Sequence, residues 1–211
     1  MKRALQIVSM TIMRAILLIM VLFLIYQQDF LFAISATVAL LISLTPIYLK
    51  RKYKIDFPWL LEFLVIVILL LHLFGENFGL FVKIRFYSPM MHFFGTAIIA
   101  FFAYMTIYLL NCAGKIDLPR YLLVIFVIAF ALGLGAVWEI GEFASDKYLG
   151  TTDQGDGIDP LDDTMYDLIF DGIAGLFIAI IGEASVRSKQ FLHFSKQIIR
   201  KLGKVKSKMV K

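Results

Sequence analysis

Carboxylates are concentrated in one part of this chain. Ten of its 16 acidic residues lie between positions 139 and 171. These ten are Glu139, Glu142, Asp146, Asp153, Asp156, Asp159, Asp162, Asp163, Asp167 and Asp171. The segments on either side of residues 144–163 are strongly apolar, so the acids gather at one end of two consecutive helices. Ionisable residues gathered in this way within apolar helices predict a site that holds cations or handles protons.

The spacing of these residues places several of them on shared helix faces. Glu139 and Glu142 are three residues apart, and Asp163, Asp167 and Asp171 follow one another at intervals of four. On a helix, the three aspartates form a stripe only about 80° wide. Two histidines belong to the same pattern. They are His72, four residues before Glu76, and His92, at the start of another apolar segment.

Histidine and carboxylate groups together predict a divalent metal site. A histidine nitrogen with several carboxylate oxygens suits Zn, Mn or Fe, whereas a set of carboxylates alone suits Ca or Mg. Clustered carboxylates repel one another, so protons or a cation must neutralise part of their charge. The predicted metal ligands are His72, His92, Glu139, Glu142, Asp156, Asp159 and Asp163. A plainer alternative stays open for Asp162 and Asp163, since either could simply cap a helix and favour its N-terminal dipole.

The elements that must position these residues are membrane-spanning helices. The chain is 60% hydrophobic, and Phe supplies 20 of its 211 residues. Because about 20 apolar residues span a bilayer, the sequence predicts an all-α, polytopic bundle with one transmembrane domain over residues 1–186. The predicted helices are 7–26, 30–49, 57–74, 91–110, 121–143 and 164–181. Alternatively, residues 2–12 lie along the membrane surface.

The distribution of basic residues predicts the orientation of this bundle. Six spans place both termini on one side, and eighteen of the 21 Lys and Arg residues then lie on that side. Only Lys83, Arg85 and Lys147 lie on the other. By the positive-inside rule, both termini are cytoplasmic in a prokaryotic plasma (inner) membrane. The histidines and carboxylates then meet at the extracytoplasmic face.

Residues 187–211 form a basic tail with nine Lys or Arg and no acid. Phe191, Phe194, Ile198, Leu202 and Val205 recur at helical spacing. The tail is therefore predicted to be a cytoplasmic amphipathic helix on anionic inner-leaflet lipid, or else a simple topology anchor. The net charge of +5 is thus a topology signal, and no nucleic-acid partner is expected.

Four ordered motifs resemble a known family. They are Leu71-His72-Leu-Phe-Gly75, Tyr87-Ser-Pro-Met-Met-His92-Phe93, Trp138-Glu139-Ile-Gly-Glu142-Phe143, and the run from Gly150 through Gln154-Gly-Asp156 and Asp159 to Met165. Over roughly residues 55–183 the chain resembles the YjdF-like family of prokaryotic inner-membrane proteins. That resemblance favours the same polar residues as a site and implies no particular reaction. A looser similarity to VanZ-like membrane proteins implies a place in the cell envelope.

Three functions are compatible with this pattern. The first is a metal-dependent enzyme acting on a lipid or lipid-linked phosphate, with Glu139 or Glu142 as general base and Lys83 or Arg85 binding the anionic group. The second is a cation or proton transporter with Asp167 and Asp171 as an inward relay. The third is a non-catalytic scaffold that binds a structural metal. An enzyme needs a site closed on its inner side, whereas a transporter needs polar groups that continue inward.

Overall fold

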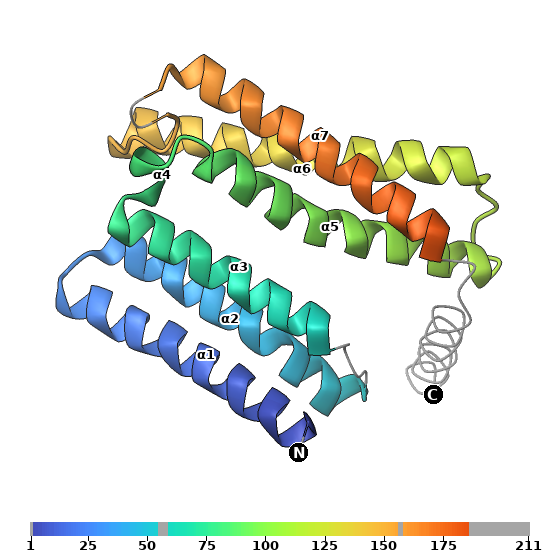
Figure 1. Ribbon diagram of the computed structural model, residues 1–211, viewed down its shortest axis with the longest axis horizontal. Helices are drawn as coiled ribbons and strands as arrows, with labels where there is room; N and C mark the ends of the chain where they lie inside the picture. Colours follow the sequence, from blue (N-terminus) through green and yellow to red (C-terminus); the bar gives the residue numbers. More distant parts are fainter. Residues whose placement is uncertain (1, 55–58, 156–157, 186–211) are drawn as a thin grey trace. The chain divides into compact units, whose positions relative to one another are not determined.

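The computed structural model describes residues 2–54, 59–155 and 158–185 (Figure 1). Throughout these ranges the regular structure is helical and no strand occurs, as the sequence predicts. Within them, six helices are long and apolar enough to cross a membrane. They are α1 (Lys2–Tyr26), α2 (Phe30–Tyr53), α3 (Trp59–Phe78), α5 (Tyr87–Cys112), α6 (Arg120–Leu149) and α7 (Pro160–Ser185). The chain is an integral membrane protein.

The helices extend beyond their predicted ends because local capping, not hydropathy, decides where they stop. α6 runs on to Leu149 and ends at Gly150, whose left-handed backbone (φ 73°) lets its N–H donate to the Asp146 carbonyl. α7 begins at Pro160, a residue suited to a first helical position. A short helix, α4 (Leu80–Lys83), lies in the predicted loop over residues 75–90.

The first unit of the chain, up to Gly79, contains α1, α2 and α3. All three helices contact one another (Figure 1). Fully buried Leu17 of α1 and Ile66 of α3 pack with small residues of α2, among them Ala36. One polar group crosses this apolar core: Arg14 of α1 forms an ion pair with Glu62 of α3.

The second unit begins at Leu80, and its long helices α5, α6 and α7 also all contact one another (Figure 1). Several of the residues buried between them are small, such as Ala100, Ala131 and Ala174, whereas many large apolar side chains are exposed. This arrangement is expected of helices packed in lipid. Gly175 permits α7 to approach α6 closely, since a Cβ there would lie 2.8 Å from Ala131 Cβ and 3.1 Å from Ile128 Cα.

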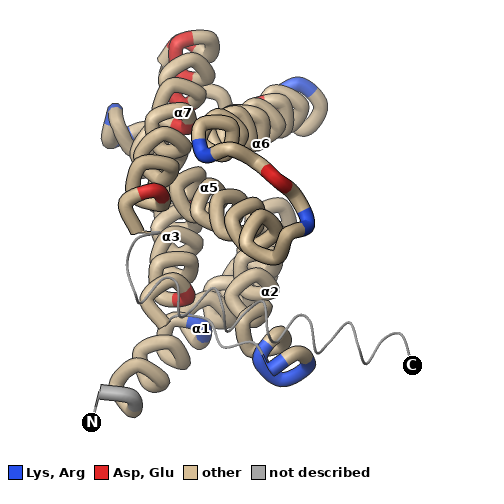
Figure 2. The backbone as a smooth tube through the Cα atoms, turned by 90° about the vertical axis from the view of Figure 1, so that its right-hand side faces the viewer, with Lys and Arg blue, Asp and Glu red and all other residues tan. Residues whose placement is uncertain are grey.

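Charged residues are segregated along the helices (Figure 2). Acidic residues follow one another along α7, while Lys50, Arg51 and Lys52 occupy the last turn of α2. The cytoplasmic location of both termini stays a prediction. The predicted tail helix over residues 187–211 lies outside the described residues.

Candidate metal centre

The aspartate stripe of α7 points into the second unit. Asp163 is 6% exposed, and Asp167 and Asp171 are fully buried. Because α7 packs against both α5 and α6, the stripe faces the space between those two helices. Three successive carboxylates are thus removed from solvent, so each needs hydrogen bonds, protons or a cation.

His92 of α5 lies at the centre of these carboxylates. Its Nε2 atom is 3.5 Å from Glu139 Oε1 of α6 and 3.5 Å from Asp167 Oδ2 of α7. These three ligand-type atoms all lie within 4.8 Å of one another. Its other ring nitrogen, Nδ1, is 3.3 Å from Asp171 Oδ2. One imidazole therefore meets one carboxylate from α6 and two from α7.

Several oxygens around His92 have no hydrogen-bond donor. Both oxygens of Glu139, Oδ1 of Asp167 and Oε2 of Glu142 are buried and lack a hydrogen-bond partner within the described part of the chain. Buried polar atoms in native proteins nearly always have partners, and leaving a charged one unpaired is costly. The group of atoms is therefore incomplete as it stands, and either protons or a cation would complete it.

Two hydroxyl groups of α5 support the carboxylates. Ser88 Oγ donates a hydrogen bond to Asp167 Oδ2 at 2.7 Å, and Thr96 Oγ1 donates to Asp171 Oδ1. Sequence reasoning missed both residues. Ser88 lies four residues before His92 and Thr96 four residues after it, so all three share one face of α5. That spacing is the signal that could have found them.

Asp171 is held in place by the absence of a side chain on α6. A Cβ atom added to Gly135 would overlap the Asp171 carboxyl group. The carboxyl group fills the space that a side chain would take and accepts from Thr96 on its other oxygen. An imidazole that donates its Nδ1–H to the Asp171 carboxylate would keep its Nε2 lone pair for a ligand.

An apolar layer closes the end of the centre that lies beyond Asp171. Ala100, Val127, Ala131 and Ala174 are all fully buried between the three helices, on the far side of Asp171 from Asp163. The next buried polar contact is at the other end of the unit, where the Tyr104 hydroxyl donates to Glu183 Oε1 at 3.2 Å. Within the described helices the carboxylate stripe therefore ends at Asp171.

The loop after α6 folds over the opposite end, and Asp146 organises it. The Asp146 carboxylate accepts the backbone N–H groups of Asp153 at 2.6 Å and Gln154 at 2.8 Å, and the Thr151 hydroxyl at 2.7 Å. Gln154 Nε2 then donates to Thr164 Oγ1 of α7 at 3.0 Å. The loop thus links the end of α6 to the start of α7 beside the candidate metal centre.

The remaining predicted site residues have other surroundings. Glu142 Oε1 accepts the Trp138 indole N–H at 2.7 Å, and Asp159 Oδ1 accepts the Leu161 N–H at the start of α7. His72 belongs to the first unit, where its Nε2 lies 3.2 Å from Glu76 Oε1. Asp156 lies outside the described residues.

The predicted anion-binding residues lie shortly before His92 in the sequence. Lys83 ends α4, and the Arg85 guanidinium lies 5.8 Å from the centre of the Phe86 ring. Both side chains are exposed, so both are accessible to an anion.

Residues 8–188 match the family described as "Predicted membrane protein (DUF2238)". The chain belongs to this family. A relative from Thermotoga maritima, described as "Uncharacterized protein", is 37% identical over 101 residues. That match covers 46% of this chain and 47% of the relative, so it spans about half of each protein. No solved structure matches the chain.

Proposed function

We propose that this DUF2238 protein is a divalent-metal-dependent enzyme of the prokaryotic inner membrane, acting on a lipid or lipid-linked phosphate. The observation that carries the proposal is the group of unpaired oxygens facing His92. Glu139 and Asp167 each place an oxygen 3.5 Å from Nε2. The basic group that meets these carboxylates in the described structure is a single imidazole, so negative charge is in excess.

The distances fit a metal better than they fit hydrogen bonds. Ligand atoms about 2.1 Å from a tetrahedral metal stand roughly 3.4 Å from one another. The two contacts of Nε2 with carboxylate oxygens are close to that value and longer than ordinary hydrogen bonds. One nitrogen and two oxygens favour Zn, Mn or Fe over Ca or Mg. Three protein ligands leave a position for water or substrate, as catalytic sites require.

The surrounding residues divide the chemical roles. A bound metal would polarise a phosphoryl oxygen or lower the pKa of a water molecule. Glu142 stands one helical turn from Glu139 and is the general base in this proposal, because its Oε2 is unpaired. Lys83 and Arg85 hold the anionic group of the substrate. Asp171, Thr96 and Ser88 keep the ligands oriented.

The apolar layer argues against transport. A transported ion or proton needs polar groups across the whole membrane. On the inner side of Asp171, Val127, Ala131 and Ala174 fill the space between the helices instead. A centre closed on its inner side suits an enzyme that meets its substrate at the extracytoplasmic face. Its partners in this proposal are the membrane lipid that it acts on and the anionic inner-leaflet lipid that the basic tail binds.

Metal analysis of the purified protein tests the proposal. We expect about one divalent metal per chain in the wild type, and loss of it in both His92→Ala and Glu139→Gln. Glu183→Gln is the matched control, because it removes a carboxylate charge at the other end of the same unit and should leave the metal content unchanged. A folded wild type without metal, unaltered by a chelator, would overturn the proposal.

The same variants separate an enzyme from a metal-stabilised scaffold. A structural metal contributes to folding, so its loss unfolds the protein. We expect His92→Ala and Glu139→Gln to lose the metal but to stay monodisperse and helical in detergent. Unfolding of both variants on metal loss would favour the scaffold.

A further inference from the structure

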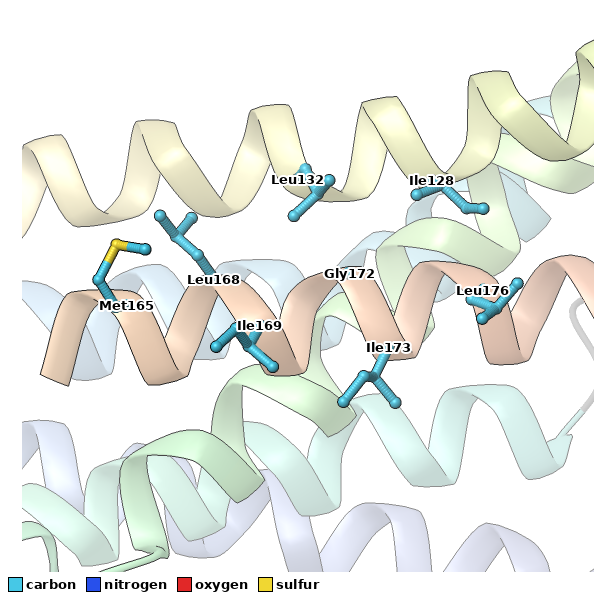
Figure 3. Close-up of a pocket in the computed structure, with 8 residues that line it drawn as sticks. All are labelled: Ile128, Leu132, Met165, Leu168, Ile169, Gly172, Ile173 and Leu176. Atoms are coloured by element: carbon cyan, nitrogen blue, oxygen red, sulfur yellow. The ribbon is translucent and has the colours of Figure 1, made fainter. Parts of the chain in front are cut away.

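An apolar groove runs along the outer side of the contact between α6 and α7 (Figure 3). Its lining includes Ile128 and Leu132 from α6, and Met165, Ile169, Ile173 and Leu176 from α7. Every lining side chain is apolar, and several are about half exposed, such as Ile169 at 51% and Ile173 at 48%. Such a groove offers no hydrogen bond, so its occupant must be a hydrocarbon group.

The length and position of the groove match one leaflet of a membrane. From Met165 to Leu176 the groove follows α7 over twelve residues, and the eleven steps between them cover about 16 Å at 1.5 Å per residue. The hydrocarbon core of a bilayer is about 30 Å thick, so this length is close to that of one leaflet. Most of the groove lies in the half of α7 nearer to Pro160, which is also the half that carries the three aspartates, and its far end at Leu176 lies just beyond the middle of the helix.

The groove and the metal centre lie on two sides of the same helix contact. Asp167 and Asp171 point inward, while their neighbours Leu168 and Gly172 line the groove. α7 packs closely on α6 at Gly172, where an added Cβ would lie 3.3 Å from Leu132 Cδ2. A chain in the groove that ends near Met165 therefore brings whatever it is attached to level with Asp163 and Asp167.

We propose that the α6–α7 groove binds one acyl chain of a phospholipid and so positions the phosphate of that lipid at the mouth of the metal centre. The proposal deepens the proposed function, because it names a phospholipid as the class of substrate. The bound acyl chain belongs to a lipid of the leaflet at the Pro160 end of α7. The length of the groove and its apolar lining select the acyl chain. The carboxylate-held metal would supply the positive charge that a phosphate requires.

The shape of the lining favours a lipid over another helix. Helices associate in membranes through small residues that let backbones approach and through polar side chains that bond across the contact. The exposed rim of this groove carries Ile169, Ile173 and Leu176 instead, all of them large and apolar. A flexible acyl chain can pack between such side chains, whereas the backbone of a second copy of this protein could not come close.

Native mass spectrometry of the purified protein, titrated in detergent with phosphatidylglycerol, tests the groove. We expect the wild type to retain one phospholipid, and Ile169→Trp and Ile173→Trp to reduce that retention at least tenfold by filling the groove. Ile180→Trp is the matched control. It lies two turns beyond Ile173 on the same face of α7, outside the groove lining, and should retain lipid as the wild type does.

Three results would overturn the proposal. Equal lipid retention in all variants would mean that lipid binds elsewhere, and no retained lipid in the wild type would mean that the groove holds none. A dimer in the wild type that becomes a monomer in Ile173→Trp would identify a second copy as the occupant. Metal content measured on the same samples separates the two proposals. Metal without retained lipid would refute only the groove, and retained lipid without metal would refute only the metal centre.

Discussion

Two charged clusters of this protein, one in each unit, treat charge in opposite ways. In the first unit, Arg14 meets Glu62, and its Nε and Nη2 atoms also donate to the Ser43 carbonyl at 3.1 and 3.0 Å. One positive and one negative group cancel. In the second unit, three carboxylates contact one imidazole, and four buried oxygens of Glu139, Glu142 and Asp167 lack a hydrogen-bond donor within the described residues. The first set is electrically complete and the second is not.

In our proposal, this difference separates a structural contact from a binding site. The Arg14–Glu62 pair ties α1 to α3, and the Ser43 carbonyl adds α2, so all three helices of the first unit share one polar contact. Nothing further is needed to satisfy it. The His92 group leaves excess negative charge and unpaired oxygens in a buried place, and a cation satisfies both. Buried charge in a membrane protein indicates function most strongly where its own side chains leave it unbalanced.

The largest expected effect comes from breaking the balanced pair. Removing one partner of a buried ion pair leaves an uncompensated charge and typically costs about 3–5 kcal/mol. We expect Arg14→Met, Glu62→Met and Glu62→Gln each to lower the free energy of unfolding in detergent by about that amount. Unfolding monitored by circular dichroism in mixed micelles measures it.

The double variant Arg14→Met with Glu62→Met is the control for this prediction. Replacing a whole buried pair by apolar residues is often nearly neutral, so the double variant should recover most of the lost stability. If the stability loss of the double variant equalled the sum of the two single losses, the ion pair would not be what stabilises the contact between α1 and α3.

The next effect tests the space that Asp171 occupies. Gly135→Ala places a methyl group where the Asp171 carboxyl group lies. We expect it to cost about 1–3 kcal/mol of stability, as overpacked cores do, and to reduce the metal content. Gly133→Ala, two residues earlier on α6, is a matched control, since a Cβ there meets nothing within 4 Å. Equal loss in both variants would point to a general helix effect.

A smaller effect is expected from the residues that position His92. Loss of the carboxylate that holds a metal-ligating histidine typically weakens metal binding by 10–100-fold, or about 1.4–2.7 kcal/mol. We expect Asp171→Asn to fall in that range and Thr96→Val, which removes the hydroxyl behind Asp171, to show a smaller loss. Competition with a fluorescent chelator gives the affinity.

A spectroscopic measurement shows whether Asp171 acts through His92. Nitrogen-15 NMR of the imidazole reports which ring nitrogen carries the proton. We expect the Nδ1–H tautomer in the wild type and a mixture of tautomers in Asp171→Asn. An unchanged tautomer together with weakened metal binding would make Asp171 a ligand in its own right.

Much of the fold follows from the sequence because hydropathy and bilayer thickness decide it. Six apolar runs predict six helices, and the structure contains six within its described residues. Hydropathy does not set helix ends, which depend on single capping groups. The end of α6 at Leu149 and the short helix α4 therefore depart from the prediction.

The candidate site could be predicted by residue type and face, but not by contact. Helical spacing indicates that Asp167 and Asp171 share a face with Asp163, and burial of all three agrees. The rotation of α5 about its axis cannot be read from a uniformly apolar helix, so nothing in the sequence ranks His92 above His72 as the partner of Glu139. Ser88 and Thr96 escape notice because hydroxyl groups are common in membrane helices, where most bond to their own backbone.

The smallest change in stability that we expect is an increase, whereas the variants of Arg14 and Glu62 are expected to lose stability. Glu142 stands three residues from Glu139, and like charges at that spacing destabilise a helix by about 0.2–0.5 kcal/mol. In metal-free protein, Glu142→Gln should therefore raise stability by about that amount, because it relieves repulsion while its amide oxygen can still accept from Trp138. Glu62→Gln, the same change of acid to amide in the first unit, lowers stability. If Glu142→Gln lowered it as well, Glu142 would have to be balanced by a positive group, and the contrast between the two units would fail at that residue.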